Sequence, residues 1–239
     1  TLILLIPGLM IQDLIRERQN RSLETIEKIN NKWSNAQTFC GPVISIPYTT
    51  MQVNPDNKTT IQEHLLNITP ENLNITTQLF PEERYYGIYK TILYKSEIDI
   101  TGNFDKINFP KPENSIIHWE QAYLSIGVSD LRGITENIDF KLDNKQLSVE
   151  ATGNLDTQIG KMLVMPLKNT DPLLFSQPQT FNCKLKLNGS SNINFIPIGK
   201  TTKVHVTGNW KSPGFIGNFS PEHHITEKGF EADWSILSF

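Results

Sequence analysis

The sequence predicts a mainly β fold: a large antiparallel β-sandwich or packed sheets, preceded by one long N-terminal amphipathic helix. Three observations predict this fold. The spacing of apolar residues changes from about 3.6 residues before Pro42 to 2 after it. Alternating segments then recur with turn-forming residues between them, as in strands joined by turns. No second long stretch with helical spacing follows, so the strands are expected to pair with one another.

The first element is a helix expected over residues 9–33. Charged residues occupy most of its surface, and Glu17 and Arg21 have the favourable order for an ion pair one turn apart. One face carries apolar side chains spaced three or four residues apart, namely Leu23, Ile26, Ile29 and Trp33. We expect this face to pack on the β domain, with Trp33 at the end that meets the domain. Residues 13–36 are therefore assigned to a helix that leads into that domain.

An apolar stretch, residues 1–11, precedes the charged part of this helix. It is shorter than the run of about 20 apolar residues that crosses a bilayer. A signal peptide would end in small residues at a cleavage site, whereas Pro7, Gly8 and a charged helix follow here. We expect residues 1–12 to be the remnant of an N-terminal transmembrane helix. The alternative is an ordinary buried helix or strand of a soluble protein.

The remainder, residues 37–239, is expected to form one β-rich domain, because neither a repeat of fixed period nor a low-complexity linker divides it. The Gly41-Pro42 pair is expected to close the connection from the helix. The region 162–178 contains three prolines and is expected to be a loop or a short helix. Strands are predicted at residues 43–48, 61–75, 85–104, 119–128, 138–142, 147–151, 181–187, 203–210 and 230–236. Tight turns are expected at Asp143-Asn144 and Asn188-Gly189. The four tryptophans are expected to fill the core.

Composition excludes several classes of function. The net charge is −3 and no basic stripe is present, so no nucleic-acid partner is expected. The hydrophobic fraction of 38% and charged fraction of 20% fit a folded domain rather than a disordered chain. The two cysteines, Cys40 and Cys183, cannot make a zinc site by themselves. Two separate buried thiols are the favoured interpretation, and one disulfide is the alternative.

No motif in the sequence predicts an enzyme, a metal site or a cofactor. Neither a GxSxG elbow nor an HExxH zinc motif occurs. The acids and histidines Glu222, His223, His224 and Glu227 resemble a ligand set, but adjacent histidines on a strand point to opposite faces. Exposed loop histidines are therefore favoured over a metal site. A hydrolase would need acids and histidines gathered from distant segments, such as Asp130, His223, His224 and Glu227.

Three groups of residues are candidates for binding a partner. The first is Arg84 with Tyr85 and Tyr86, and the second is Asp130 with Arg132; structural pairing is the alternative for both. The third is the segment 213–219, where apolar side chains stand between glycines, as in a partner-binding or membrane-dipping loop. Its candidate residues are Pro213, Phe215 and Phe219. The alternative for this segment is a β-bulge corner with both phenylalanines turned inward.

Four blocks of the sequence, in order, resemble the CreD family of bacterial inner-membrane, cell-envelope integrity proteins. The first block carries Glu17, Arg18, Arg21, Trp33, Gln37, Gly41, Pro42, Pro47 and Tyr48. The second carries Pro81, Arg84, Gly87, Ile88, Tyr89 and Gly102. The third carries Trp119, Ala122, Asp130, Arg132 and Gly133. The last carries Trp210, Pro213, Phe215, Gly217, Phe219, Pro221, Gly229, Phe230, Ala232 and Trp234.

This resemblance implies one N-terminal membrane helix, a large domain facing the periplasm and a bundle of further membrane helices. The present chain would then be the periplasmic domain of such a protein. The implied role is envelope integrity and tolerance of envelope-directed stress, through an unidentified envelope protein, glycan or lipid that the domain binds or scaffolds. The resemblance implies no reaction and no catalytic residues. An envelope hydrolase is the alternative function.

Overall fold

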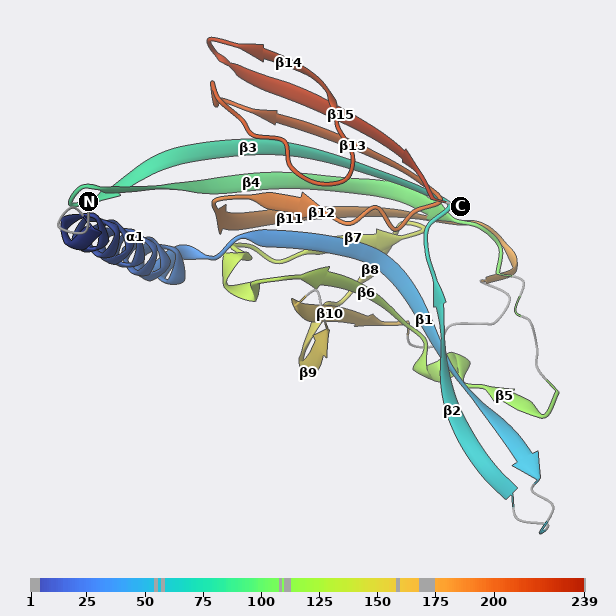
Figure 1. Cartoon of the computed structure of the whole chain (residues 1–239). Helices are drawn as coiled ribbons and strands as arrows, with labels where there is room; N and C mark the ends of the chain where they lie inside the picture. The colour runs from blue at the N-terminus through green and yellow to red at the C-terminus, as the bar shows by residue number, and fades with distance from the viewer. Residues whose placement is uncertain are drawn as a thin grey trace.

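The computed structural model describes residues 5–53, 56, 59–107, 109, 113–157, 160–167 and 175–238. It consists of one long helix beside two packed β-sheets, which confirms the predicted fold class (Figure 1). The helix is α1 (Leu5–Trp33), and two short 3-10 turns are η2 (Trp119–Gln121) and η3 (Leu131–Gly133). The strands are β1 (Gln37–Val53), β2 (Thr59–Ile68), β3 (Asn72–Tyr86), β4 (Tyr89–Phe104), β5 (Ser115–Ile117), β6 (Tyr123–Val128), β7 (Asp139–Leu142), β8 (Lys145–Leu147), β9 (Glu150–Thr157), β10 (Gly160–Pro166), β11 (Gln179–Ser190), β12 (Ile193–Phe195), β13 (Thr201–Gly208), β14 (Glu222–Thr226) and β15 (Gly229–Leu237).

The larger sheet has the strand order β14-β15-β13-β3-β4-β11-β7-β8. The second sheet has the order β12-β1-β6-β10-β9, and β2 and β5 also pair with β1. Among the described strands, the β1–β12 and β3–β13 pairs are parallel and the other pairs are antiparallel. Both parallel pairs join strands that are far apart in the sequence. Long connections therefore place strands in each sheet, in addition to hairpins between consecutive strands.

The core lies between the two sheets and follows the strand period. In β3, Leu73, Ile75 and Thr77 are buried while Asn74 and Thr76 are exposed. The largest fully buried side chains are Phe39, Phe104, Phe140, Phe175, Ile44, Ile46, Leu73, Ile75, Ile98, Ile100, Leu124 and Ile126. The tryptophans do not belong to this set, contrary to the prediction: Trp33, Trp119, Trp210 and Trp234 are all half-buried at its margins.

Several boundary predictions were wrong. The 61–75 segment is two strands, β2 and β3, which are separated by residues 69–71, and residues 119–121 form η2 rather than strand. The 85–104 segment is not one strand, because Gly87 has a φ of 60° and turns the chain between β3 and β4. Part of the 162–178 region is strand β10, where backbone pairing with β6 continues up to Pro166. Asn188-Gly189 lies inside β11 rather than at a turn, and the chain turns instead at Ser191, whose φ is 63°. In contrast, the Asp143-Asn144 turn is present between β7 and β8.

Strand β1 follows the helix and pairs with β12, β6, β2 and β5 of the second sheet. The helix connection is residues 34–36, so the prediction that Gly41-Pro42 closes it was wrong. These two residues lie inside β1, where the pairing with β6 shifts between Cys40 and Val43. Proline has no N–H to donate to the ladder, which is a physical reason for the break in register there.

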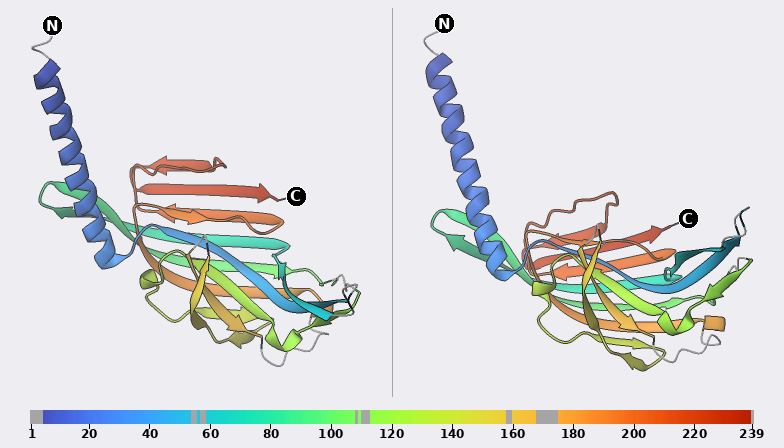
Figure 2. Two further views of the ribbon diagram at one scale, coloured as in Figure 1. Left: turned by 60° about the horizontal axis from the view of Figure 1, so that its bottom comes forward. Right: turned by 90° about the horizontal axis from the view of Figure 1, so that it is seen from below.

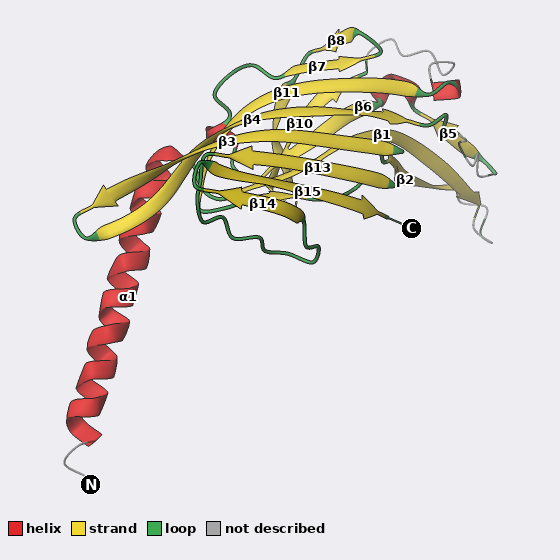
Figure 3. Ribbon diagram, turned by 90° about the horizontal axis from the view of Figure 1, so that it is seen from above, coloured by secondary structure: helices red, strands yellow, loops and turns green. Residues whose placement is uncertain are grey.

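The helix α1 runs continuously through residues 12 and 13 and extends away from the sheets (Figure 2, Figure 3). Its Trp33 end packs on the β domain as predicted: the Trp33 indole N–H donates to the Tyr94 carbonyl at 3.4 Å. The predicted packing of Leu23 was wrong, because this side chain lies beyond the sheets and is 66% exposed. Within the described residues, which begin at Leu5, no helix is long and apolar enough to cross a membrane.

The two cysteines are buried, free thiols, as favoured from the sequence. Burial raises the pKa of the Cys183 thiol to about 12 and also raises the pKa of the Cys40 thiol. Both thiols are therefore unreactive at neutral pH.

Candidate functional site

The candidate residues fall on three separate parts of the fold. Asp130 and Arg132 lie at η3, where α1 joins the β domain. Arg84 and Tyr86 lie at the end of β3, and the segment 213–219 lies in the connection between β13 and β14. Within the described residues, no hydrogen bond, ion pair or ring contact joins these three groups. They are therefore three candidate surfaces and not one site.

Asp130 and Arg132 fasten the end of α1 to the β domain. The Arg132 guanidinium binds both carboxylate oxygens of Asp130, with Nη2–Oδ2 at 2.6 Å and Nε–Oδ1 at 2.9 Å. The same guanidinium donates through Nη1 to the Asn31 carbonyl in the last turn of α1 at 2.8 Å. The Asn35 backbone N–H donates to Asp130 Oδ2 at 3.1 Å. These contacts are the structural pairing that was the alternative for Asp130 and Arg132, while partner binding by the two residues stays a prediction.

Gln37 forms the buried centre of the same junction and is 0% exposed. Its Nε2 lies within hydrogen-bond distance of Ser34 Oγ at 2.8 Å and of the carbonyls of Asp130 and Asn188, both at 3.0 Å. Its Oε1 accepts from the Asp130 backbone N–H and the Ser129 hydroxyl, both at 3.2 Å. One amide at the start of β1 thus connects the residues after α1 with Asp130 at η3 and with Asn188 in β11 of the larger sheet, both more than ninety residues away.

The junction gives the domain an acid-sensitive contact. The Arg132 guanidinium holds the pKa of Asp130 at about 2, below its ordinary value of 3.8. Because the folded pKa is the lower one, the contact stabilises the fold above about pH 4, and this stability is lost as the pH falls towards 2. We expect Asp130→Asn to cost about 1–2 kcal/mol at neutral pH. In urea unfolding, this variant should also show a weaker loss of stability between about pH 4 and 2.

Arg132→Gln is the companion variant, since the guanidinium is the main cause of the lowered Asp130 pKa. This variant should also show a weaker change in the free energy of unfolding between about pH 4 and 2. An unchanged profile in both variants would show that the contact is not formed in solution.

The turn between β3 and β4 projects beyond the other strands, beside α1 (Figure 3). We call residues 85–89 the hairpin tip. Tyr85, Tyr86 and Ile88 are 63%, 68% and 81% exposed. The structure therefore places Tyr86 in a cluster of large exposed side chains, as expected for a binding surface. Sequence reasoning missed Ile88, because the unbroken alternation of residues 85–104 hid the turn.

Charged residues support the base of the hairpin tip. Glu83 accepts hydrogen bonds from the Tyr85 hydroxyl and from the Lys90 ammonium across the hairpin. Arg84, another predicted residue, donates to Glu82 at 2.9 Å. The pKa of the Glu83 carboxyl is lowered, first by its hydrogen bond with Lys90. Arg84 is thus paired within its own strand, while Tyr86 is free to contact a partner.

The segment 209–221 folds back over the end of the larger sheet. The Phe215 ring packs on His223, Trp234 and Phe230, with centroids 4.9, 5.8 and 6.0 Å away. The Trp234 indole N–H donates to the Phe219 carbonyl at 3.1 Å. Phe215 and Pro213 are half-buried, whereas Phe219 is 51% exposed. Phe215 therefore serves packing, and of the two phenylalanines only Phe219 presents most of its ring to a partner.

The acids and histidines suggested for a hydrolase do not come together. Asp130 belongs to the helix junction, and Glu227 pairs with Lys211 at 3.0 Å. His223 contacts Phe215, whereas His224 is the next residue on β14 and faces the opposite side of the sheet. These four residues therefore form no catalytic cluster and no common metal site.

Comparison with known proteins gives the family. The model of the CreD family, described as inner membrane protein CreD, matches residues 1–239. The chain is also 28% identical over 242 residues to "Inner membrane protein CreD" of Escherichia coli (strain K12). This match covers 100% of the chain and 53% of the relative, so the chain spans about half the length of the curated relative it matches. The resemblance seen in the four sequence blocks is thereby confirmed, and the chain belongs to the CreD family of inner membrane proteins.

Proposed function

We propose that this chain is an extracytoplasmic domain of an inner-membrane protein, that it faces the periplasm, and that it binds or scaffolds a component of the cell envelope. The family match supports the association with the inner membrane. The exposed hairpin tip carries the binding part of the proposal. The structural junction at Gln37 and Asp130 gives this surface a defined direction relative to α1.

The hairpin tip has the properties of a recognition surface. Tyr85, Tyr86 and Ile88 are large side chains that are exposed together, and none of them belongs to the hydrophobic core. Tyrosine is enriched at protein interfaces, because its ring supplies contact area and its hydroxyl a hydrogen bond. The charged pairs at the base of the tip, Glu83 with Lys90 and Glu82 with Arg84, resemble the polar rim of such a surface.

The free end of α1 supports attachment to an apolar environment. Met10, Ile11, Leu14 and Ile15 are all more than half exposed. Arg16, Arg18 and Arg21 follow on the same helix. An apolar end followed by cations suits a helix that leaves a membrane at its headgroup layer. In this arrangement the remaining turns of α1 hold the β domain away from the bilayer.

Cross-linking in living cells tests the proposal on the complete membrane protein. A photo-reactive amino acid at Ile88 should give adducts with an envelope protein, glycan or lipid. The control position is Ile61 on β2, which is 61% exposed but lies outside the hairpin tip. We expect at least a several-fold higher adduct yield at position 88, and about ten-fold less adduct when Tyr85 and Tyr86 are both replaced by serine.

Two results would overturn the proposal. Equal yields at positions 88 and 61 would show that the hairpin tip has no special partner. Adducts confined to cytoplasmic proteins would contradict the periplasmic orientation. Circular dichroism of the isolated domain with the two serine substitutions should be unchanged, because neither tyrosine is part of the core.

A further inference from the structure

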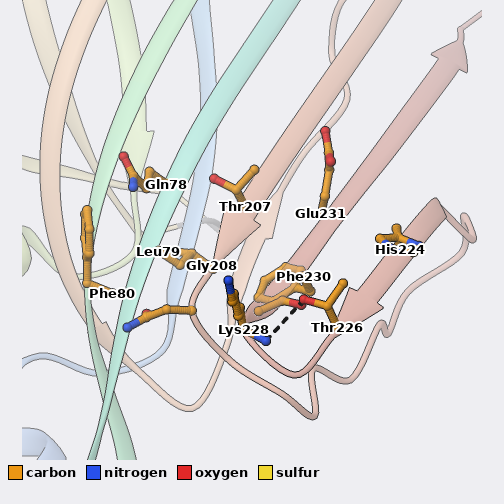
Figure 4. Close-up of a pocket in the computed structure, with 12 residues that line it drawn as sticks. Gln78, Leu79, Phe80, Thr207, Gly208, His224, Thr226, Lys228, Phe230 and Glu231 are labelled. Carbon is orange, nitrogen blue, oxygen red and sulfur yellow. Dashed lines mark hydrogen bonds between the residues drawn. The ribbon is translucent and has the colours of Figure 1, made fainter.

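The outer face of β13, β15 and β14 carries an ordered group of acids and histidines. Backbone pairing places His205, Asp233 and Glu222 in one row across the three strands. The next row holds Thr207, Glu231 and His224, so that Glu231 lies between the other two (Figure 4). Side chains of directly paired residues lie on the same face of a sheet and within contact distance. Residues far apart in the sequence are thus collected on one exposed surface.

The His205 ring has a fixed orientation within this group. Its Nδ1 lies 2.8 Å from Asp233 Oδ1, and its Nε2 lies 3.8 Å from Glu231 Oε1. An ionised carboxylate only accepts hydrogen bonds, so Nδ1 is the nitrogen that carries the proton. In the neutral ring this leaves the lone pair on Nε2, directed towards Glu231. A carboxylate that orients a histidine in this way is the usual second shell of a metal-bound imidazole.

We propose that this surface binds a divalent transition-metal ion, with Zn²⁺ as the best fit, through His205 Nε2 and the Glu231 carboxylate. Two ligands at about 2.0–2.2 Å from one zinc ion in tetrahedral geometry lie about 3.3–3.6 Å apart. The observed separation of 3.8 Å between Nε2 and Oε1 needs only a small side-chain movement to reach this value. One ligand atom each from His205, Glu231 and Asp233 lies within 4.8 Å of the others.

His224 is the direct partner of Glu231 on the neighbouring strand, but it lies outside the group whose ligand atoms are within 4.8 Å of one another. Water completes a four-coordinate ion on an exposed face. The ion would then join β13 and β15, next to the edge strand β14, whose residues are all exposed. This site is independent of the hairpin tip and of any partner bound there.

The surrounding charges favour a cation. Three carboxylates, Glu222, Glu231 and Asp233, face this surface from β14 and β15. Two opposing charges lie nearby: Lys203 on β13 lines the same depression as His205 and Asp233, and Lys228 lines the adjoining one with Glu231 and His224. The excess of carboxylates attracts a divalent ion before any coordination bond forms. The competing arrangement is a protonated His205 held between two carboxylates without metal.

Zinc titration of the metal-free domain separates these two arrangements. We expect one Zn²⁺ per chain by isothermal titration calorimetry and a higher melting temperature when Zn²⁺ is added. Co²⁺ in its place should give the visible absorption of a low-symmetry, four-coordinate site. His205→Gln and Glu231→Gln should each weaken Zn²⁺ binding by at least about ten-fold, and Asp233→Asn by about ten-fold through the lost orientation of the ring.

The control is His64→Gln on β2, which removes a histidine elsewhere in the domain and should leave Zn²⁺ affinity unchanged. Absence of Zn²⁺ binding at about 0.1 mM, which is of the order of the dissociation constant of a weak surface site, would overturn the proposal. Unchanged affinity in His205→Gln would overturn it as well. All of these side chains are at least partly exposed, so the variants should fold, and urea unfolding checks that they do.

Discussion

Replacing Gln37 by leucine is expected to lower the free energy of unfolding by about 3–5 kcal/mol. Leucine fills a similar volume but offers no hydrogen bond. The substitution therefore leaves buried groups without their partner, including the Ser34 hydroxyl and the Asp130 and Asn188 carbonyls. Each unsatisfied buried polar group costs about 1–3 kcal/mol. Equilibrium unfolding in urea measures the change.

The matched control is Gln62→Leu, which makes the same chemical change at an exposed position of β2. Its effect should stay within about 0.5 kcal/mol. Hydrogen exchange gives a second readout, because the amides near the end of α1 should exchange faster in Gln37→Leu while those in β11 keep most of their protection. A change in stability no larger than that of the control would mean that Gln37 is not the centre of the junction.

Replacing Gly229 by alanine is the second change with a large expected effect. Gly229 begins β15 with a φ of 152°, a conformation that residues with a Cβ rarely adopt. A Cβ at this position would lie 2.2 Å from the Gly208 carbonyl oxygen, which belongs to the backbone of the neighbouring strand. Because neither strand can move without breaking the pairing, we expect a loss of about 2–4 kcal/mol.

Gly214→Ala provides the control, since no atom lies within 4 Å of the added methyl group. This variant should unfold like the parent chain. The Gly229 variant should in addition lose protection from hydrogen exchange in β14, which continues directly into the affected turn. Equal stability of the two variants would contradict the close approach of β15 to Gly208.

The fold class was predictable because successive side chains along a strand point to opposite faces of the sheet. Apolar and polar residues therefore alternate in the sequence with a period of two. The alternation of buried and exposed residues in β3, from Leu73 to Thr77, is legible in the sequence itself. Turns were harder to place. Gly87 interrupts β3 and β4 without the Asn-Gly or Asp-Gly pair that usually marks a hairpin, and alternation continues on both sides.

The roles of the candidate residues depended on contacts between distant segments. Arg132 donates to Asn31 across 101 positions, and nothing local in the sequence distinguishes that contact from a surface ion pair. His205 gained a possible function only when the pairing of β13 with β15 placed it beside Glu231 and Asp233. His223 and His224 are exposed as expected, but they lie on strand β14 and not in a loop, and strand geometry places their neighbouring side chains on opposite faces.

The junction between α1 and the β domain turns the helix into a lever. With 29 residues, α1 is about 43 Å long. If the junction does not bend, a change of about 10° in the tilt of the helix moves its far end sideways by about 7–8 Å. Such a displacement is larger than the spacing between neighbouring strands. A small rotation at the N-terminal end of α1 would therefore displace the hairpin tip by more than one strand spacing, with the β domain moving as a single body.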